Sequence, residues 1–133
     1  MGSGLFFNGT SCIDGSTYTG VKFDFSGDLG GCTLAVGANF SGDSTSTDAP
    51  GRGSCPFSQD SNCYPPMAVV SPPATLDAGG PVTLKVPFAS MGSGSPTAMV
   101  DSSTILTVQW QLGARSGGPG CSAKFTVENV AFY

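Results

Sequence analysis

The sequence predicts an all-β protein, a two-layer antiparallel β-sandwich stabilised by disulfide bonds. Apolar and polar residues alternate with period two in several segments, and no helical period recurs. Only 11% of the residues are charged and there is a single Glu, so the residues that form surface helices are scarce. Five cysteines without a Cys-x-x-Cys pair, and without any histidine, indicate disulfides rather than a zinc site. The 133 residues suffice for one domain, residues 1–133.

Seven segments are expected to form strands, joined by turn-rich connections. The clear ones are residues 21–26, 33–40, 82–88, 105–112 and 123–133, and weaker strands are expected at 5–7 and 67–70. Pro87 places the end of the third clear strand at a sheet edge or a bulge, because proline cannot donate to a ladder. The apolar phase of the last strand changes at Glu128 and Asn129, which predicts a β-bulge there.

The strand at 105–112 separates apolar from polar residues most clearly. One face carries Leu106, Val108, Trp110 and Leu112, and the other carries Thr107, Gln109 and Gln111. The first face is therefore expected in the core. The stretch 41–54 shows no such periodicity and is expected to be a surface loop. The acids Asp43, Asp48, Asp60 and Asp77 are expected to be solubilising surface charge in loops.

The cysteines predict an oxidising, extracellular location. Cys55 and Cys63 bracket a short turn-rich loop and are expected to be bonded. If the last strand runs antiparallel beside residues 21–26, Cys32 and Cys121 meet at one end of the sandwich and Cys12 is left over. Pairing of Cys12 with Cys121 or with Cys32 remains an alternative, because the sequence does not rank these pairings.

Several functions are excluded by composition. Without histidine there is no Ser-His-Asp or Cys-His nucleophile and no histidine general base. A net charge of −4 with five cations argues against nucleic acid and anionic membrane as partners. No apolar run is long enough to span a bilayer. Residues 1–4 do not have the pattern of a signal peptide, and residues 1–11 are either a cloning remnant or the remainder of an upstream strand.

Five segments, in order, resemble those of bacterial carbohydrate-binding modules with a galactose-binding-like jelly-roll fold. The first, from Cys12 to Phe23, is similar to the pattern C-[IV]-D-x-S-x-Y-x-G-[IV]-x-F. The others lie at 55–64, 83–89, 105–111 and 125–132, so the likeness covers residues 12–133. The resemblance implies a jelly roll and a secreted, non-catalytic module that binds a polysaccharide or oligosaccharide.

Two departures from that family matter. Its members usually have one or two further strands before the segment at Cys12, so either the sandwich is trimmed or a neighbouring chain supplies an edge strand. This motivates an alternative function, a structural surface or filament subunit that self-associates through exposed strand edges or Cys12. The family's closing acidic pair is Glu128-Asn129 here, and the resemblance implies that Glu128 could ligate a structural calcium, the one cofactor considered.

Six residues are candidates for contacting carbohydrate. Gln109 and Gln111 offer amide donors and acceptors to sugar hydroxyls. Trp110 is either a core residue, as its apolar strand face indicates, or a stacking platform. The other three are Tyr64 at a loop rim and the strand residues Asn39 and Lys85, which would line the same groove if the strand order brings them there.

No catalytic residue is expected. A glycosidase needs two carboxylates roughly 5 to 10 Å apart, one of them with a raised pKa. Asp24, Asp28 and Glu128 are the only acids near strand segments that could be neighbours. The chain is therefore not expected to be an enzyme.

Overall fold

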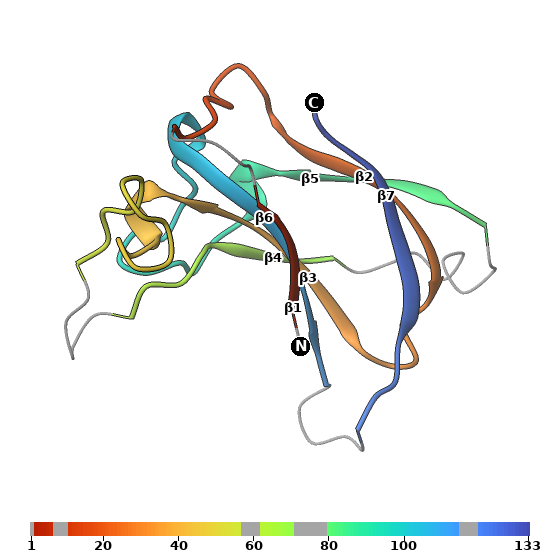
Figure 1. Ribbon diagram of the computed structural model, residues 1–133. Coiled ribbons are helices and arrows are strands. Elements are labelled where there is room, and N and C mark those ends of the chain that lie inside the picture. The colour runs from red at the N-terminus through yellow and green to blue at the C-terminus, as the bar shows by residue number, and fades with distance from the viewer. Residues whose placement is uncertain (1, 7–10, 57–61, 71–79, 115–119) are drawn as a thin grey trace.

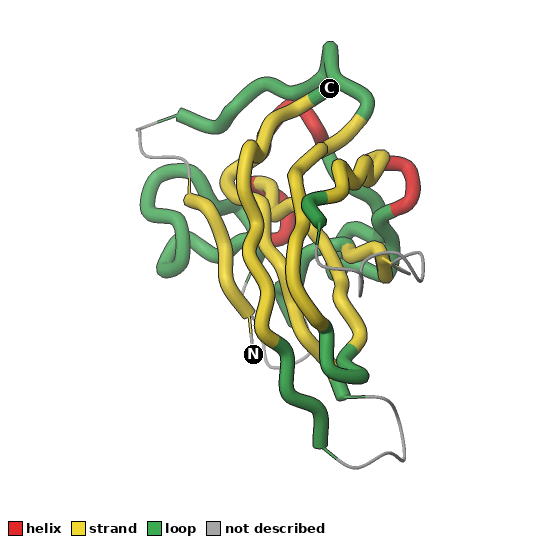
Figure 2. The backbone as a smooth tube through the Cα atoms, turned by 90° about the vertical axis from the view of Figure 1, so that its right-hand side faces the viewer, coloured by secondary structure: helices red, strands yellow, loops and turns green. Residues whose placement is uncertain are grey.

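The computed structural model consists of two antiparallel β-sheets (Figures 1 and 2). It describes residues 2–6, 11–56, 62–70, 80–114 and 120–133, with backbone only for 2–6. The four-stranded sheet has the order β1 (Gly2–Phe6), β6 (Ile105–Gly113), β3 (Thr33–Phe40) and β4 (Met67–Val70). The three-stranded sheet has the order β5 (Val82–Pro87), β2 (Gly20–Asp28) and β7 (Lys124–Phe132). The prediction of an all-β sandwich is confirmed.

All seven expected strands are present, with ends that differ by a few residues. Pro87 closes β5, which is an edge strand as expected. The bulge in β7 is also confirmed, since Asp24 pairs with Glu128 but Lys22 pairs with Ala131. Asn129 takes up the extra residue in a left-handed conformation with φ 51°. Phe7, expected at the end of the first strand, lies outside the described residues.

Three short 3-10 helices occur in the described ranges, at Ser41–Asp43 (η1), Phe88–Ser90 (η3) and Ser102–Thr104 (η4). Each is a single turn at the end of a strand or next to one. None of the helices in this part of the chain has the length and apolar character needed to cross a membrane.

The core lies between the inner faces of the two sheets. From the three-stranded sheet, β2 contributes Val21, Phe23 and Phe25, all with no exposed surface. Phe23 meets Trp110 of β6 edge to face, with ring centroids 5.5 Å apart. Phe25 stacks on Phe125 of β7 at 5.2 Å. The contact between Phe23 and Trp110 joins the two sheets, and the one between Phe25 and Phe125 lies within the three-stranded sheet. Burial of these rings fixes which face of β2 and of β6 points outward.

The edge of β6 is covered by residues of this chain. β1 pairs antiparallel with β6, from Gly2 opposite Gln111 to Phe6 opposite Thr107. The strand expected at residues 5–7 therefore pairs with β6, and β1 is the edge strand of this sheet. That a neighbouring chain supplies a further strand stays a prediction.

Both expected disulfides are formed. Cys32 is bonded to Cys121 across 89 residues of sequence, and Cys55 to Cys63 across 8. β2 and β7 are antiparallel neighbours, which is the arrangement from which the first pairing was predicted. Cys12 is free and partly buried. Its pairing with Cys32 or Cys121, the alternative, is wrong.

The two disulfides should stabilise the fold unequally. A crosslink lowers the conformational entropy of the unfolded chain, and it does so more when it closes a longer loop. The gain in the free energy of unfolding is about 4.6 kcal/mol for a separation of 89 residues and about 2.5 kcal/mol for 8. The double variant Cys32→Ser/Cys121→Ser should therefore lose more free energy of unfolding in urea than Cys55→Ser/Cys63→Ser. Cys12→Ser is the matched control and should leave the midpoint unchanged. A larger loss from the short-loop variant would contradict this assignment.

Candidate functional site

Gln109 and Gln111 lie on the outer face of the four-stranded sheet. β6 is a central strand of that sheet, and Val108 and Trp110 point from it into the core. Alternation then directs Gln109 and Gln111 to the opposite side. Gln111 is exposed and Gln109 is half-buried. The expected polar face carries both amides, but its third member, Thr107, is buried, with 4% of its surface exposed.

Trp110 is a core residue and not a sugar platform. It is 6% exposed and packs edge to face on Phe23, as its alternation with Val108 indicated. A pyranose could not reach either face of its ring. Its inclusion among the carbohydrate-contacting residues is therefore wrong.

Apolar side chains from β4 lie beside the two glutamines. Met67 is the cross-strand partner of Gly37, and a Cβ at Gly37 would lie 2.2 Å from the Met67 Sδ. The thioether therefore crosses the sheet over this glycine, and Gln109 Nε2 donates to Met67 Sδ at 3.5 Å. Val69 is on the same side of β4 and is 70% exposed. We call this outer surface, formed by Gln109, Gln111, Met67 and Val69 over Gly37, the amide face.

Asn39 extends the amide face, and Lys85 does not belong to it. Asn39 is opposite Thr107, two positions from Gly37 along β3, so it shares the outer side with Gln109. Its Oδ1 is buried with no partner among the described residues. Lys85 lies on β5, in the other sheet, opposite Lys22. The expectation that Lys85 lines the same groove as the glutamines is wrong, because it depended on an order of strands that alternation does not encode.

Tyr64 is exposed where the chain approaches β4. Its backbone pairs with Ser95 through two hydrogen bonds of 3.0 and 2.9 Å. The side chain is 47% exposed, so it is available at the surface three residues before Met67. The position at a loop rim after Cys63 was expected.

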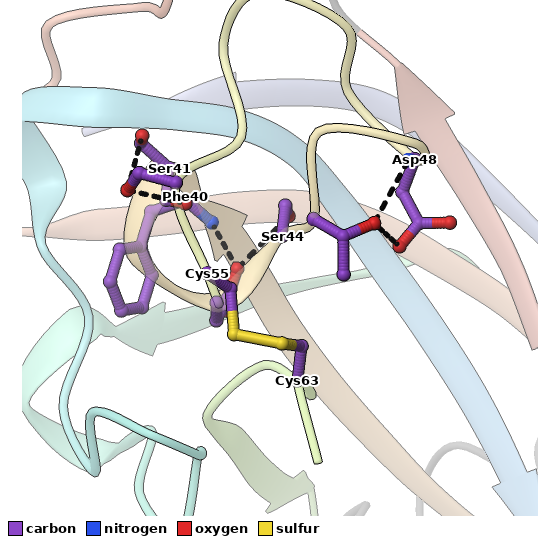
Figure 3. Close-up of a disulfide and its surroundings, with 9 residues drawn as sticks. Phe40, Ser41, Ser44, Asp48, Cys55 and Cys63 are labelled. Atoms are coloured by element: carbon purple, nitrogen blue, oxygen red, sulfur yellow. Dashed lines mark hydrogen bonds between the residues drawn. A yellow bond between two sulfur atoms is a disulfide. The ribbon is translucent and has the colours of Figure 1, made fainter. Parts of the chain in front are cut away.

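The segment 41–55 is folded back on itself (Figure 3) and, as expected of a surface loop, has residues 46–48 and 50 exposed. Ser44 O accepts from Cys55 N at 2.9 Å, and Ser41 O accepts from Ser54 N at 2.8 Å. Asp43, expected as solubilising charge, is 2% exposed, so that expectation is wrong. Asp48 is exposed and accepts from Thr45 Oγ1.

Asp43 is held at the end of β3. Phe40 N donates to Asp43 Oδ1 at 2.9 Å and Ser44 Oγ donates to the same oxygen at 3.1 Å. Asp43 Oδ2 is buried and has no partner in the described part of the chain. Burial outweighs these hydrogen bonds and raises the pKa of Asp43 from 3.8 to about 6. The sequence carries no signal of this role, because a capping box has Ser or Thr where Phe40 stands. Asp60 and Asp77 lie outside the described residues.

Two acids of the three-stranded sheet lie opposite each other. Asp24 and Glu128 are cross-strand partners on β2 and β7. The pKa of Asp24 is lowered, first by a hydrogen bond from Thr83 and then by one from Asn129, which is the opposite of what a general acid needs. Asp43 has the raised pKa, but it is buried away from any substrate.

The surroundings of Glu128 do not fit a calcium ion. Asp24 of β2 is the acidic partner of Glu128 in register. Calcium takes six to eight oxygen ligands. Among the described residues, no group of three or more His, Cys, Asp or Glu side chains could hold a metal ion.

Comparison of the chain with protein-family models, curated proteins and solved structures finds no match.

The buried Asp43 should make stability depend on pH. Its folded pKa of about 6 lies above the unfolded 3.8, so the folded state binds more protons between these values. This contribution is complete below pH 3.8 and is lost as pH rises through 6, a change of about 3 kcal/mol. Asp43→Asn keeps an acceptor for Phe40 N and should flatten the dependence between pH 4 and 7 in urea titrations. An unchanged slope in the variant would rule out Asp43 as its origin.

Three other acids affect stability in the opposite direction to Asp43, and they do so at lower pH. Hydrogen bonds lower the pKa values of Asp14, Asp24 and Asp101. Their stabilisation is present above the unfolded value and is lost as pH falls through the folded one. The stability of the wild-type chain should therefore also decrease as pH falls below 3.8, which urea titrations at successive pH values would show.

Proposed function

We propose that this chain is a secreted, non-catalytic module that binds polysaccharide on its amide face. The observation that carries the proposal is the position of Gln109 and Gln111, which lie on the outer side of a core strand beside Met67 and Val69. Amides can both donate to and accept from sugar hydroxyls. The adjacent apolar side chains suit the C–H surfaces of a sugar ring. This combination of a few polar groups on an apolar, preformed surface is typical of small-molecule sites.

The rigidity of the face supports the same proposal. Both glutamines are on a strand with neighbours on each side, β1 and β3, so its backbone is fixed by two ladders. The hydrogen bond to Met67 Sδ orients the Gln109 amide before any ligand binds. Preorganised groups lose little entropy on binding.

The resemblance to bacterial carbohydrate-binding modules agrees with this proposal, and a jelly-roll assignment is part of it. Two disulfides are consistent with secretion into an oxidising compartment. The alternative, a subunit that assembles through a strand edge, would use the edge strands β1, β4, β5 and β7 or the free Cys12.

Affinity electrophoresis against soluble glucans, xylans and mannans tests the proposal. The wild-type chain should be retarded by at least one of them. Gln109→Ala and Gln111→Ala should each weaken that binding about three- to tenfold, because one or two hydrogen bonds to hydroxyls are lost. Thr126→Ala, an exposed polar residue of β7 on the other sheet, is the matched control and should bind as the wild type does.

Two results would contradict the proposal. One is no retardation on any of these polysaccharides, and the other is undiminished retardation of both glutamine variants. Sedimentation under oxidising and reducing conditions addresses the alternative, because an assembling subunit would not remain a monomer in both.

A further inference from the structure

Two lysines lie side by side on the outer face of the three-stranded sheet. Lys22 of β2 and Lys85 of β5 are direct cross-strand partners. They share the outer side because Val21, Phe23 and Val86 next to them are buried. Like charges in this position destabilise a sheet, and the chain has only five cations in total. Neither ammonium forms an ion pair within 4.0 Å with a described residue. Lys22 acts electrostatically on Asp24, and both ammonium groups can still contact an anionic ligand.

A row of carboxylates lies next to the lysine row. Asp24 follows Lys22 by two positions on the same side of β2, about 7 Å along the strand. Its cross-strand partner on β7 is Glu128. Thr83 Oγ1 and Asn129 Nδ2 donate to Asp24, the latter at 2.7 Å, and these hydrogen bonds keep the carboxylate oriented. The surface is thus bipolar, positive in one row and negative in the next.

An aromatic ring borders the lysine row. Lys85 Nζ lies 5.1 Å from the centroid of the Tyr133 ring. This contact restrains the ammonium on the sheet surface and provides an apolar plane beside it. We call the surface formed by Lys22, Lys85, Asp24, Glu128 and Tyr133 the lysine face.

We propose that the lysine face binds a sugar acid, with the carboxylate of a uronic acid on Lys22 and Lys85 and its hydroxyls donating to Asp24 and Glu128. A uronic acid carries an anionic group at one end of the ring and hydroxyl donors at the other, which matches the two rows. The ring of Tyr133 supplies an apolar contact for the sugar. This site is on the opposite sheet from the amide face and does not depend on what the amide face binds.

Other occupants fit the lysine face less well. A dense polyanion would place charge on the carboxylate row as well, and the net charge of −4 repels it. A second copy of the chain would find a small surface, since two strands about 30 Å long and one about 20 Å long, spaced about 4.8 Å apart, present roughly 400 Å². A stable interface needs about 800 Å² from each partner.

Titration calorimetry of the full chain with trigalacturonic acid tests the proposal. Lys22→Gln and Lys85→Gln should each raise the Kd about five- to tenfold, because a charge-assisted contact is lost. Lys124→Gln is the matched control, because it removes the same charge from the same sheet. Lys124 is on β7 opposite Asp28, four residues before Glu128 and outside the lysine face. Its Kd should change less than twofold. The neutral galactose trimer should not compete with the acid.

Four results would overturn the proposal. They are no binding of trigalacturonic acid, equal losses in all three lysine variants, competition by the neutral trimer, and equal binding of dextran sulfate, which would indicate simple ion exchange. A dimer in sedimentation that Lys85→Gln dissolves would assign the face to self-association instead. The proposal for the amide face fails separately, because it is measured with neutral polysaccharides and glutamine variants.

Discussion

The contact between Phe23 and Trp110 is the constraint on which the two outer surfaces depend. It joins the central strand of the three-stranded sheet to a central strand of the four-stranded sheet, with ring centroids 5.5 Å apart. Side chains alternate along a strand, so burying these two rings directs the neighbours of each to solvent. Gln109 and Gln111 are outside because Trp110 is inside, and Lys22 and Asp24 are outside because Phe23 is inside. A slip of one residue in either strand would exchange the core for the surface.

The two outer faces differ in ways that suggest different ligands. The amide face has neutral amides beside a thioether and an exposed valine, which suits hydroxyls and C–H groups. The lysine face has rows of opposite charge with an aromatic ring at its border. Each set of side chains is carried by strands that also form the core, so both surfaces are as rigid as the sandwich. The two proposed sites therefore lie on opposite sides of one rigid core.

Alternation within short segments predicted the strands, but which residues meet in the site depends on how strands distant in the sequence pair. All seven strands and the bulge at Asn129 were predictable, because each depends on alternation within a few residues. The Cys32–Cys121 bond was predictable from one assumption about strand direction. Lys85 was assigned to the wrong face because its sheet depends on the pairing of β5 with β2. Asp43 was taken for surface charge because the segment 41–55 has no periodicity, and its burial results from packing of that segment. Met67 was missed because only the pairing with Gly37 brings its side chain to Gln109.

The chain contains a single tryptophan, so its fluorescence reports on the contact that organises the fold. The most direct test of the account is the emission of Trp110 and its quenching by acrylamide in the native protein. The emission of Trp110 should be blue-shifted, resist quenching and stay unchanged when a saccharide binds, because the indole lies between the sheets. A red-shifted, readily quenched emission, or one that a saccharide protects, would place Trp110 on the surface and reverse the faces of β6.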